Sequence, residues 1–573
     1  MAFTSLSGSE SPESIQTPLL HAVVQGSVGY NGLPIYRSNS GGWRSASFIL
    51  VMELAERFAY FGIASNLITY LTGPIGQSTA TAAENVNAWT GTSFLFPVIG
   101  AFVADSFLGR YRTIVVGSLI CILGLGLLTL STAISSFNAS NCPSTDISTS
   151  CSPSSFQVVF FFFSLYLVAF GQGGYKSCVQ AFGADQFDEK DPQERKAKSS
   201  FFNWWYFSMC SGILVARLII VYIQDNLSWT FGFGIPCIVM VIALFIFLLG
   251  IKTYRYSAEV EKKNAFQRIG QVFVATIRNW RSSCSAIALE EEACGSPPHH
   301  SSEQFKFLDK AQFVPNDSKE LEKVCSLSDV EEAKAVLRLV PIWASCLLFG
   351  VVDVQFSTLC TKQGATMDRS ISPGFDIPPA SLQSLMSLSI VSFIAIYDRI
   401  IVPIARNVTG EPSGITMLQR IGTGMFFSAL SMAIATVVEM KRLEIAREYG
   451  LVDEPNVTVP MSIWWLIPQY VAAGVADALT SIGMQEFFYD QVPRELRSVG
   501  LSLYISAFGI GSFISSFLIS IIGRVTGGEG RDSWFANNLN RAHLDYFYWL
   551  LAGLSTVQLI AYLYVAKKYV YKR

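Results

Sequence analysis

The apolar positions of this chain gather in long runs that polar stretches separate. A helix that crosses a bilayer needs roughly 20 mostly apolar residues. Such runs form two sets of six, near 46–71, 88–106, 113–136, 156–180, 203–223 and 231–251, then near 336–358, 380–404, 415–438, 463–486, 499–522 and 546–566. The pattern therefore predicts an all-α membrane protein with twelve spanning helices in two groups.

The polar stretches divide the chain into five predicted parts. The N-terminal part is rich in Ser, Gly and Pro and lacks the basic and apolar regions of a cleaved signal peptide, which predicts disorder. The five parts are a cytoplasmic tail over 1–45, a six-helix bundle over 46–251, a linker over 252–335, a second six-helix bundle over 336–566 and a short cytoplasmic tail over 567–573.

Two local signals stand out in the linker. The stretch 258–280 has apolar residues at helical spacing beside a basic side, which predicts an amphipathic helix along the membrane surface. Further on, Ser328 is followed three residues later by Glu331. This spacing predicts a capping box at the start of the seventh span.

Lys and Arg in the short loops predict the orientation, because cytoplasmic loops carry an excess of these residues. The loop after the second span contains Arg110 and Arg112, and those after the first, third and fifth spans contain neither residue type. Further basic residues follow the fourth and tenth spans: Lys190, Arg195, Lys196, Lys198, Arg494 and Arg497. Both termini and the linker are therefore expected in the cytoplasm. The sequence leaves the plasma membrane and the vacuolar membrane open.

Composition supports a membrane protein and argues against several other classes. Of 573 residues 51% are hydrophobic and 15% charged, against about 25% charged in soluble chains. A net charge of −2 gives no basic field for nucleic acid. The eleven Cys form no CxxC pair, and no His lies well inside an apolar run. We therefore expect no enzyme, no metal site and no cofactor apart from protons as a coupling ion.

The loops predicted to face outward offer two sites of modification. Cys142 and Cys151 share the loop after the third span, where an oxidising compartment would permit a disulfide, with free thiols as the alternative. Asn138 and Asn456 begin Asn-X-Ser/Thr sequons in outer loops and are candidate glycosylation sites.

Two six-helix halves joined by a cytoplasmic linker are typical of a secondary transporter, whose substrate site lies near mid-membrane between the halves. Three charges stand inside the first span, namely Glu53, Glu56 and Arg57. Their spacing of i, i+3 and i+4 places them on one helix face. Since a charge facing lipid costs at least about 2.5–3.5 kcal/mol, we expect this face to line a polar cavity.

Two carboxylates and one guanidinium leave one carboxylate without a partner. In a poorly solvated cavity such a group holds a proton more readily than in water. We therefore expect Glu56 to carry the coupling proton, with Glu53 and Arg57 tuning it. A static ion triad that only locks the first helix is the structural alternative.

Further charges lie in other spans. Lys176 is in the first half and Glu486 in the second, so a salt bridge between them would close one side of the cavity. Asp353 lies in the seventh span. For Arg217 and Asp477 we expect snorkelling or helix-packing hydrogen bonds rather than a part in coupling.

Several blocks carry a resemblance to a known family. The sequence resembles the proton-coupled oligopeptide transporter family of the major facilitator superfamily, and in particular its plant branch, the nitrate/peptide transporter family. The likeness covers roughly 45–570. The blocks are ELAERFAYFG (which matches the family's ExxER motif), GAFVADSFLGRYRTI, GGYKSCVQAFGADQFD, FFNWWYFSMCSG and QEFFYDQVPRELRSVG.

The resemblance implies a major-facilitator fold and a role for several residues. Glu53, Glu56 and Arg57 would be the proton-coupling triad. Lys176 would form a salt bridge with Glu486 in the inward-open state. The resemblance also implies a latch at the inner ends of helices 2 and 3, formed by Asp105, Arg110 and Arg112.

Some positions depart from the family pattern and bear on the substrate. Cys210 replaces a usual Asn, and Asp353 stands where a nitrate-carrying relative has a substrate-binding His. An acid here resembles the helix-7 acid of bacterial peptide carriers, so Asp353 is a candidate second proton site. Tyr60 and Gln355 are further candidate substrate residues, and Phe61 replaces a second tyrosine common in peptide carriers.

We therefore predict a proton-coupled symporter for a small solute, with nitrate as the favoured substrate. Alternatives are a di- or tripeptide symporter and a carrier of a plant hormone or secondary metabolite. A sensor that binds substrate with little transport is an alternative of another class, because Ser282, Ser283 and Ser285 in the linker are candidate kinase sites. We expect a monomer with no nucleic-acid partner.

Overall fold

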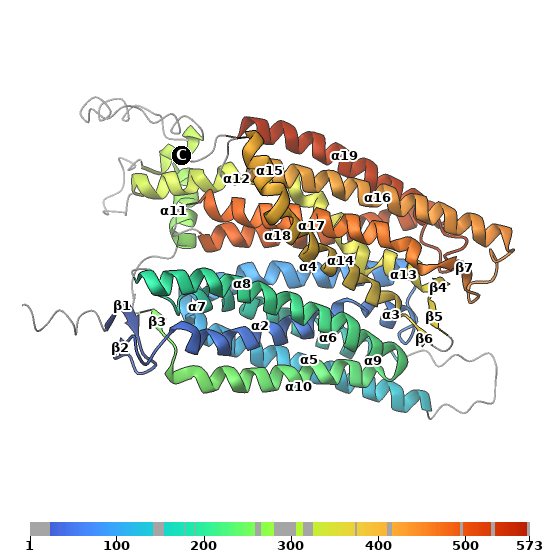
Figure 1. Ribbon diagram of the computed structural model, residues 1–573, viewed down its shortest axis with the longest axis horizontal. Helices are drawn as coiled ribbons and strands as arrows, with labels where there is room; N and C mark the ends of the chain where they lie inside the picture. The colour runs from blue at the N-terminus through green and yellow to red at the C-terminus, as the bar shows by residue number, and fades with distance from the viewer. Residues whose placement is uncertain are drawn as a thin grey trace, which may run out of the picture.

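The computed structural model describes residues 23–140, 154–176, 178–188, 191–257, 265–279, 305–312, 325–372, 375–409, 415–492, 497–528 and 533–569. Its helices form two groups that lie side by side, the first coloured blue to green and the second yellow to red (Figure 1). Strand β1 (Val23–Val28) and the last turn of α19 (Leu544–Lys568) lie at the same end of the molecule. We call this the terminal end and the opposite one the distal end.

The first half contains six long helical stretches. Several are continued by a short helix or a π-helical turn. They are α2 (Gly42–Ala64) with α3 (Leu67–Thr72), α4 (Thr79–Val103) with η1 (Ala104–Leu108), α5 (Arg110–Ser140), α6 (Ser155–Lys176) with α7 (Val179–Ala184), α8 (Pro192–Val215) with η2 (Ala216–Ile220) and α9 (Val221–Asn226), and α10 (Trp229–Leu249) with η3 (Gly250–Lys252).

The second half contains the other six, and its short strands lie at the distal end, on the right of Figure 1. The helices are α12 (Leu327–Asp353) with η6 (Val354–Ser357) and α13 (Leu359–Ala365), η7 (Pro379–Leu382) with α14 (Gln383–Ile396), η8 (Tyr397–Ile401) and α15 (Val402–Thr409), α16 (Met417–Glu448), η9 (Ile463–Leu466) with α17 (Ile467–Asp490), α18 (Arg497–Thr526), and α19. The strands are β4 (Met367–Asp368), β5 (Ser370–Ser372), β6 (Phe375–Asp376) and β7 (Val459–Ser462), paired as β4–β7 and β5–β6.

Ten helical stretches of the described chain are long and apolar enough to cross a membrane. Helices α2 and α17 are of similar length, with 23 and 24 residues, but they are more polar because they contain the buried charges. Helix α2 packs against α8 and α10, and α17 packs against α16 and α14. Each of the twelve apolar runs in the sequence therefore coincides with a long helical stretch, and ten of these stretches in the described chain meet the length and apolarity of a membrane span.

The part between the halves contains α11 (Ala265–Arg278) and η5 (Lys306–Gln312). Val272 of α11 is fully buried, while Val274 and Ile277 are mostly exposed. Helix α11 packs against η5 and α12 at the terminal end. The amphipathic helix expected over 258–280 thus exists over 265–278, and one of its faces packs against protein.

The expectation of a disordered tail over 1–45 is wrong for residues 23–45. Strand β1 pairs antiparallel with both β2 (Pro34–Tyr36) and β3 (Tyr256–Ser257), and α2 already begins at Gly42. The turn between β1 and β2 contains Asn31-Gly32, with φ of +75° at Gly32. Asn-Gly between short apolar stretches is a strong hairpin signal, and it marks the element that the compositional argument missed.

Ion pairs attach this hairpin to the terminal end of the first half. Arg37 lies 2.7 Å from Asp188 and 2.9 Å from Asp191, measured between guanidinium nitrogens and carboxylate oxygens. Buried Arg255 binds Glu194 at 2.6 Å. Asp191 also caps α8 by accepting hydrogen bonds from two backbone N–H groups, and these bonds lower the pKa of its carboxyl.

The capping box of α12 lies two residues before the predicted position. Ser326 Oγ accepts a hydrogen bond from Asp329 N at 3.1 Å, and Asp329 Oδ2 accepts one from Ser326 N at 3.1 Å. The Ser328–Glu331 box is therefore wrong, since Ser328 already lies inside the helix. Asp at the third position serves here in place of the Glu or Gln of the sequence rule.

The corrected position of the cap can be tested by comparing a substitution at Ser326 with one at Ser328. Ser326→Ala is expected to accelerate amide hydrogen exchange in the first turn of α12 about fivefold, because losing an N-cap costs about 1 kcal/mol. Ser328→Ala is the control, and exchange should stay within error of the unsubstituted protein. Equal acceleration in both variants would contradict the assignment.

Candidate functional site

The three charged residues of α2 face the interior, as their spacing predicts. Glu53 and Glu56 are each 1% exposed. Arg57 Nε donates to Glu53 Oε1 at 2.7 Å and lies 3.5 Å from Glu56 Oε2. Both oxygens of Glu56 are buried without a hydrogen-bond partner. The guanidinium thus pairs mainly with Glu53, and Glu56 has no hydrogen-bond partner among the described residues.

Lys176, the last residue of α6, approaches Glu56 from the other side. Its Nζ lies 3.8 Å from Glu56 Oε1, which is beyond hydrogen-bond distance. The same atom lies 3.8 Å from the centroid of the Tyr60 ring and 5.0 Å from that of Phe94. Lys176 Nζ has no hydrogen-bond partner among the described residues. Charge attraction and cation–π contact hold the ammonium group in this place.

Glycines in the sequence GQGGYK bring this part of α6 close to its neighbours. A Cβ on Gly173 would lie 2.5 Å from Phe96 Cβ, and one on Gly171 would lie 2.5 Å from the backbone N of Cys121. No side chain fits at either distance, so α6 can approach α4 and α5 only with glycine there. The close approach positions Lys176 over the charges of α2.

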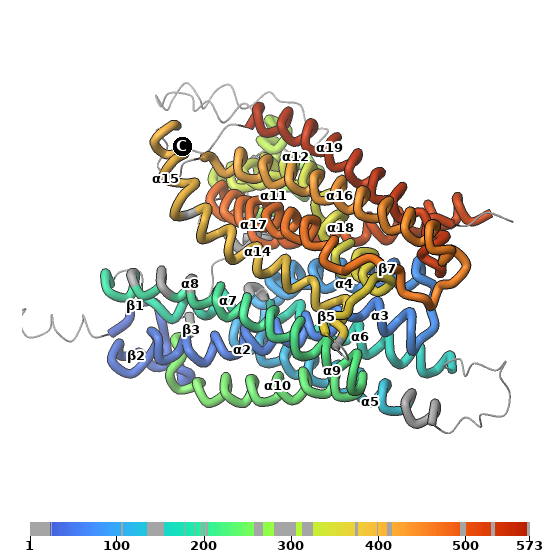
Figure 2. The backbone as a smooth tube through the Cα atoms, turned by 45° about the vertical axis from the view of Figure 1, so that its right-hand side comes forward, coloured from blue at the N-terminus to red at the C-terminus, as the bar shows by residue number. Residues whose placement is uncertain are grey.

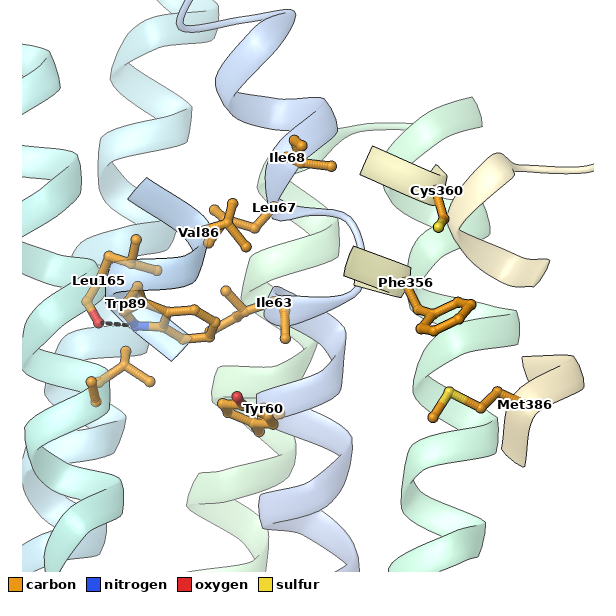
Figure 3. Close-up of a cluster of buried hydrophobic side chains, with 14 of the residues drawn as sticks. Tyr60, Ile63, Leu67, Ile68, Val86, Trp89, Leu165, Phe356, Cys360 and Met386 are labelled. Atoms are coloured by element: carbon orange, nitrogen blue, oxygen red, sulfur yellow. Dashed lines mark hydrogen bonds between the residues drawn. The ribbon is translucent and has the colours of Figure 1, made fainter. Parts of the chain in front are cut away.

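An aromatic group fixes the ring beneath Lys176. Tyr60 stacks on Trp89 with centroids 5.4 Å apart and an interplanar angle of 22°. Trp89 Nε1 donates to the carbonyl oxygen of Leu165 at 3.0 Å (Figure 3). Phe356 and Met386 of the second half stand opposite this group in the same view. Tyr60 is therefore held firmly by its neighbours, and its part in substrate binding stays a prediction.

Two buried residues beside this cluster were missed in the sequence. Both amide atoms of Gln172 and the hydroxyl of Tyr175 are buried without hydrogen-bond partners. Tyr175 interacts electrostatically with Glu53 and Glu56. Gln172 precedes Lys176 by four residues, so helical spacing alone places it on the same face.

A second group of charges lies between the halves. Asp353 ends α12, Asp477 is on α17, and both interact electrostatically with Arg217 in η2 of the first half. Asp477 accepts a hydrogen bond from the hydroxyl of Ser481, one turn along the same helix. This bond lies within α17, so the packing hydrogen bond between helices that was expected of Asp477 stays a prediction.

Arg217 also makes packing hydrogen bonds, but they cross from one half to the other. Its Nη1 donates to the carbonyl oxygen of Gln383 at 2.8 Å and to Ser387 Oγ at 2.6 Å. Both acceptors belong to α14, which runs beside α8 (Figure 2). The sequence placed Arg217 within the membrane but could not show which half it binds.

The ion pair expected between Lys176 and Glu486 is not formed in this structure. Glu486 Oε2 lies 3.7 Å from Arg420 Nη1, and the Glu486 side chain is 45% exposed. Lys176 is held instead by Glu56 and the aromatic rings. Arg420, on the neighbouring helix α16, supplies a closer partner that motif comparison did not indicate.

The latch of Asp105, Arg110 and Arg112 stays a prediction. Arg110 Nη1 lies 2.5 Å from Asp185 Oδ2, and the Arg112 side chain is exposed. The side chain of Asp105 lies outside the described residues. Both arginines line a cavity of about 1020 Å³ at the terminal end, beneath the β1–β2 turn.

Gln355 serves the packing of the halves. Its Nε2 donates to the carbonyl oxygen of Val351 and to Ser515 Oγ, each at 2.7 Å. Asn87 of the first half donates to the same Ser515 oxygen at 2.9 Å. Gln355 is thus one member of a hydrogen-bond chain that crosses between the halves, and its part in substrate binding stays a prediction.

The predicted modification sites fall mostly outside the described residues. Cys142, Cys151 and the side chain of Asn138 lie there. Asn456 is exposed in the segment between α16 and β7. Its glycosylation stays a prediction.

Further hydrogen bonds between the halves lie toward the distal end. Lys362 Nζ donates to Thr72 Oγ1 at 2.9 Å, Gln383 Nε2 to the carbonyl oxygen of Ser65 at 2.9 Å, and Ser516 Oγ to that of Glu84 at 3.0 Å. These bonds join the ends of α2, α3 and α4 to α13, α14 and α18. The distal end is therefore closed.

Two packed helical halves, ten strongly apolar helices and a charged cluster between the halves define a multi-pass membrane transporter. The chain belongs to the POT family, whose model matches residues 111–535. It is similar to two Arabidopsis thaliana proteins. Identity is 61% to Protein NRT1/ PTR FAMILY 5.10 over 557 residues (97% of each chain) and 57% to Protein NRT1/ PTR FAMILY 5.14 over 553 residues (96% of this chain, 97% of the relative).

Solved structures share the fold of this chain. An auto-inhibited POT family peptide transporter matches with a TM-score of 0.69 at 22% identity, over 92% of this chain and 98% of that one. The POT family transporter PepTSo matches with a TM-score of 0.68 at 20% identity and the same coverage. The predicted fold and the predicted family are both confirmed.

Proposed function

We propose that this transporter is a proton-coupled symporter that works by alternating access, and that its substrate is an anion, with nitrate first. The observation that carries the proposal is the position of Lys176, which contacts Glu56 and Tyr60 but has no hydrogen-bond partner. A buried ammonium group in this state retains its full capacity to donate to an anionic ligand.

Proton and anion binding are coupled because Glu56, which would carry the proton, lies beside Lys176, which would bind the anion. While Glu56 is ionised, its charge neutralises Lys176 and repels an entering anion. A proton on Glu56 removes that charge and leaves Lys176 to the substrate. Proton and anion therefore favour each other's binding, and the effect is reciprocal by linkage. Arg57 is paired with Glu53 rather than with Glu56, through the hydrogen bond from its Nε at 2.7 Å.

The proposal also covers the orientation of the chain in the membrane and the membrane in which it lies. The Lys and Arg bias of the loops supports a cytoplasmic position for the terminal end. The closed distal end would then be the outer side. The membrane would be the plasma or vacuolar membrane. Regulation by kinases at the linker serines and a monomeric state are further expectations.

Asp353 favours a second candidate, a di- or tripeptide. It places a carboxylate in the second half, while Lys176 places a cation in the first. A zwitterionic peptide would present its carboxylate to Lys176 and its ammonium group to Asp353. An anion such as nitrate would use only the cation and would require Asp353 to be protonated or turned away.

Cells that express the full chain and contain a pH-sensitive dye would separate the two candidates. In acidic external medium, nitrate is expected to acidify the cytoplasm, whereas chloride and a panel of dipeptides are not. Acidification by dipeptides alone would replace the proposal with the second candidate. A tagged protein would be used to check surface expression in each case.

A further inference from the structure

A fully buried ion pair lies inside helix α16 of the second half. Glu439 and Arg442 are each 0% exposed, and Arg442 Nη2 lies 2.6 Å from Glu439 Oε1. Gln363 of α13 donates to Glu439 Oε2 at 2.8 Å. Desolvation offsets most of the attraction between two buried charges, so such a pair adds little to net stability. Its remaining hydrogen bonds show what the pair holds in place.

These bonds go to residues 533–543, between α18 and α19, which we call the distal loop. Arg442 Nη1 donates to Asn540 Oδ1, and Nη2 donates to the carbonyl oxygen of Leu539, each at 2.7 Å. Asn540 Nδ2 and Asn538 Nδ2 donate to carbonyl oxygens of the segment after α16, at 2.9 and 2.8 Å. The distal loop is thus fixed to the second half by hydrogen bonds that begin at the ion pair.

Asn537 of the distal loop reaches across to the first half. Its Oδ1 accepts a hydrogen bond from the backbone N of Thr79 at 3.0 Å. Thr79 is the first residue of α4, and the N–H groups of a first turn have no partner within their own helix. Ser78 Oγ accepts a different bond of this turn, from Thr81 N at 3.1 Å. A side chain of the second half therefore completes the capping of a first-half helix.

The two ends of the distal loop differ in how easily their bonds break. Arg442 is buried, so separating it from Asn540 would leave part of a charged group without a partner, at a large cost. Asn537 is exposed, so water can replace its oxygen at Thr79 N when the halves separate. The loop is therefore attached firmly to the second half and reversibly to the first.

We propose that Asn537 is a gate residue of the outer side, which helps to hold the halves together at the distal end, and that Arg442 and Asn540 are positioning residues for it. Opening of the outer side breaks the bond to Thr79 N and leaves the distal loop on the second half. The outer location rests on the orientation proposed above. The contact between the halves depends on neither the orientation nor the substrate.

Ser65 offers a reporter of this closure. It is 1% exposed, its hydroxyl has no hydrogen-bond partner among the described residues, and its backbone carbonyl receives the bond from Gln383 of the second half. Ser65→Cys therefore changes one atom without removing a hydrogen bond. A membrane-impermeant thiol reagent added outside can reach this cysteine only when the outer side opens. Leu227→Cys, at a distal position that is 70% exposed, provides the reference rate.

Two substitutions of Asn537 in the full chain should change the Ser65→Cys rate in opposite directions. Asn537→Asp keeps the acceptor and adds a negative charge at the N-terminus of α4, which the helix dipole favours, so modification should be about twofold slower. Asn537→Lys removes the acceptor and adds an unfavourable positive charge, so modification should be about fivefold faster. The same chain without an introduced cysteine gives the contribution of native thiols.

Glu444→Lys is the control for charge. It changes the charge by the same two units that separate Asn537→Asp from Asn537→Lys, at an exposed position near the C-terminal end of α16. Helix α16 packs mainly against α17 and α19 of the second half. The Ser65→Cys rate should therefore stay as in the chain that carries Ser65→Cys alone.

Asn540→Ala tests the positioning role. It removes the acceptor of Arg442 Nη1 and should accelerate modification about threefold, because Asn537 is then no longer held opposite Thr79 N. In Asn537→Lys the same substitution should have no further effect, because no bond between the loop and α4 is left to lose. A purely structural effect of Asn540 would give the same factor in both backgrounds.

Equal rates in surface-expressed Asn537→Asp and Asn537→Lys would overturn the gate role. Equal factors for Asn540→Ala in the two backgrounds would overturn the positioning role. If Asn540→Ala does not reach the cell surface, the comparison at Asn537 decides the matter, since that side chain is exposed and its replacement leaves the core packing intact.

The assay contains no substrate, so a failure to transport nitrate leaves its outcome unaffected and tests the proposed function separately. The reference position tests the orientation. If the external reagent fails to modify Leu227→Cys in tagged protein at the cell surface, the distal end faces inward, and the outer location of the gate is overturned.

Discussion

Glu56→Gln is expected to abolish proton-driven nitrate accumulation while leaving nitrate binding intact. Glutamine has the shape of the protonated acid, so Lys176 stays free for the anion at every pH. No proton can then be carried, and uptake falls to equilibration across the membrane. The measurement is nitrate accumulation in proteoliposomes with an imposed pH gradient, alongside nitrate affinity at neutral and acidic pH.

The control for this variant is Glu444→Gln, which makes the same chemical change at an exposed carboxylate paired with Lys441. It should accumulate nitrate as the unsubstituted protein does. Accumulation retained in Glu56→Gln would show that Glu56 does not carry the proton. Affinity that still varied with pH in this variant would place a second titrating group at the anion site.

Lys176→Ala is expected to weaken nitrate binding about ten- to a hundredfold, the range for a hydrogen bond to a charged group. It should also reduce transport to background, because the carboxylate of Glu56 then has no mobile counter-charge. Lys176→Arg keeps the charge and should retain part of the binding. Equilibrium binding of nitrate to the purified protein measures the loss.

Lys441→Ala, at a lysine whose side chain is 47% exposed, is the matched control and should bind normally. If Lys176→Ala binds nitrate as well as the control does, Lys176 is not the anion site. In that case Arg217 would be the next cation to test, because its buried Nε also has no hydrogen-bond partner among the described residues.

The sequence predicted the helices well because long apolar runs follow directly from the bilayer as a solvent. It also identified α2 and α17 as spans despite their charges, because the residues around the charges remain apolar. The ends of the helices were predicted less accurately from the sequence. Helix α2 ends at Ala64, whereas the apolar run continues to residue 71, and α8 extends back to Pro192 through polar residues. Apolarity therefore locates a span without locating where its helix begins and ends.

The candidate site also has features that local sequence patterns predict and features that depend on contacts between distant parts of the chain. The shared face of Glu53, Glu56 and Arg57 follows from helical spacing and is present. The partners of Lys176 and Glu486 depend on how far apart the halves stand at each end, which no local pattern encodes. The bonds of Arg217 to α14 join residues more than 160 positions apart in the chain, so their existence could be seen only in three dimensions.

The central claim is that one proton on Glu56 accompanies one anion at Lys176. The most direct test is a proteoliposome with a pH-sensitive dye inside, to which nitrate is added outside without any imposed pH gradient. We expect nitrate to acidify the interior in the unsubstituted protein and in Glu444→Gln, and to leave it unchanged in Glu56→Gln. Nitrate entry without acidification in the unsubstituted protein would contradict the account.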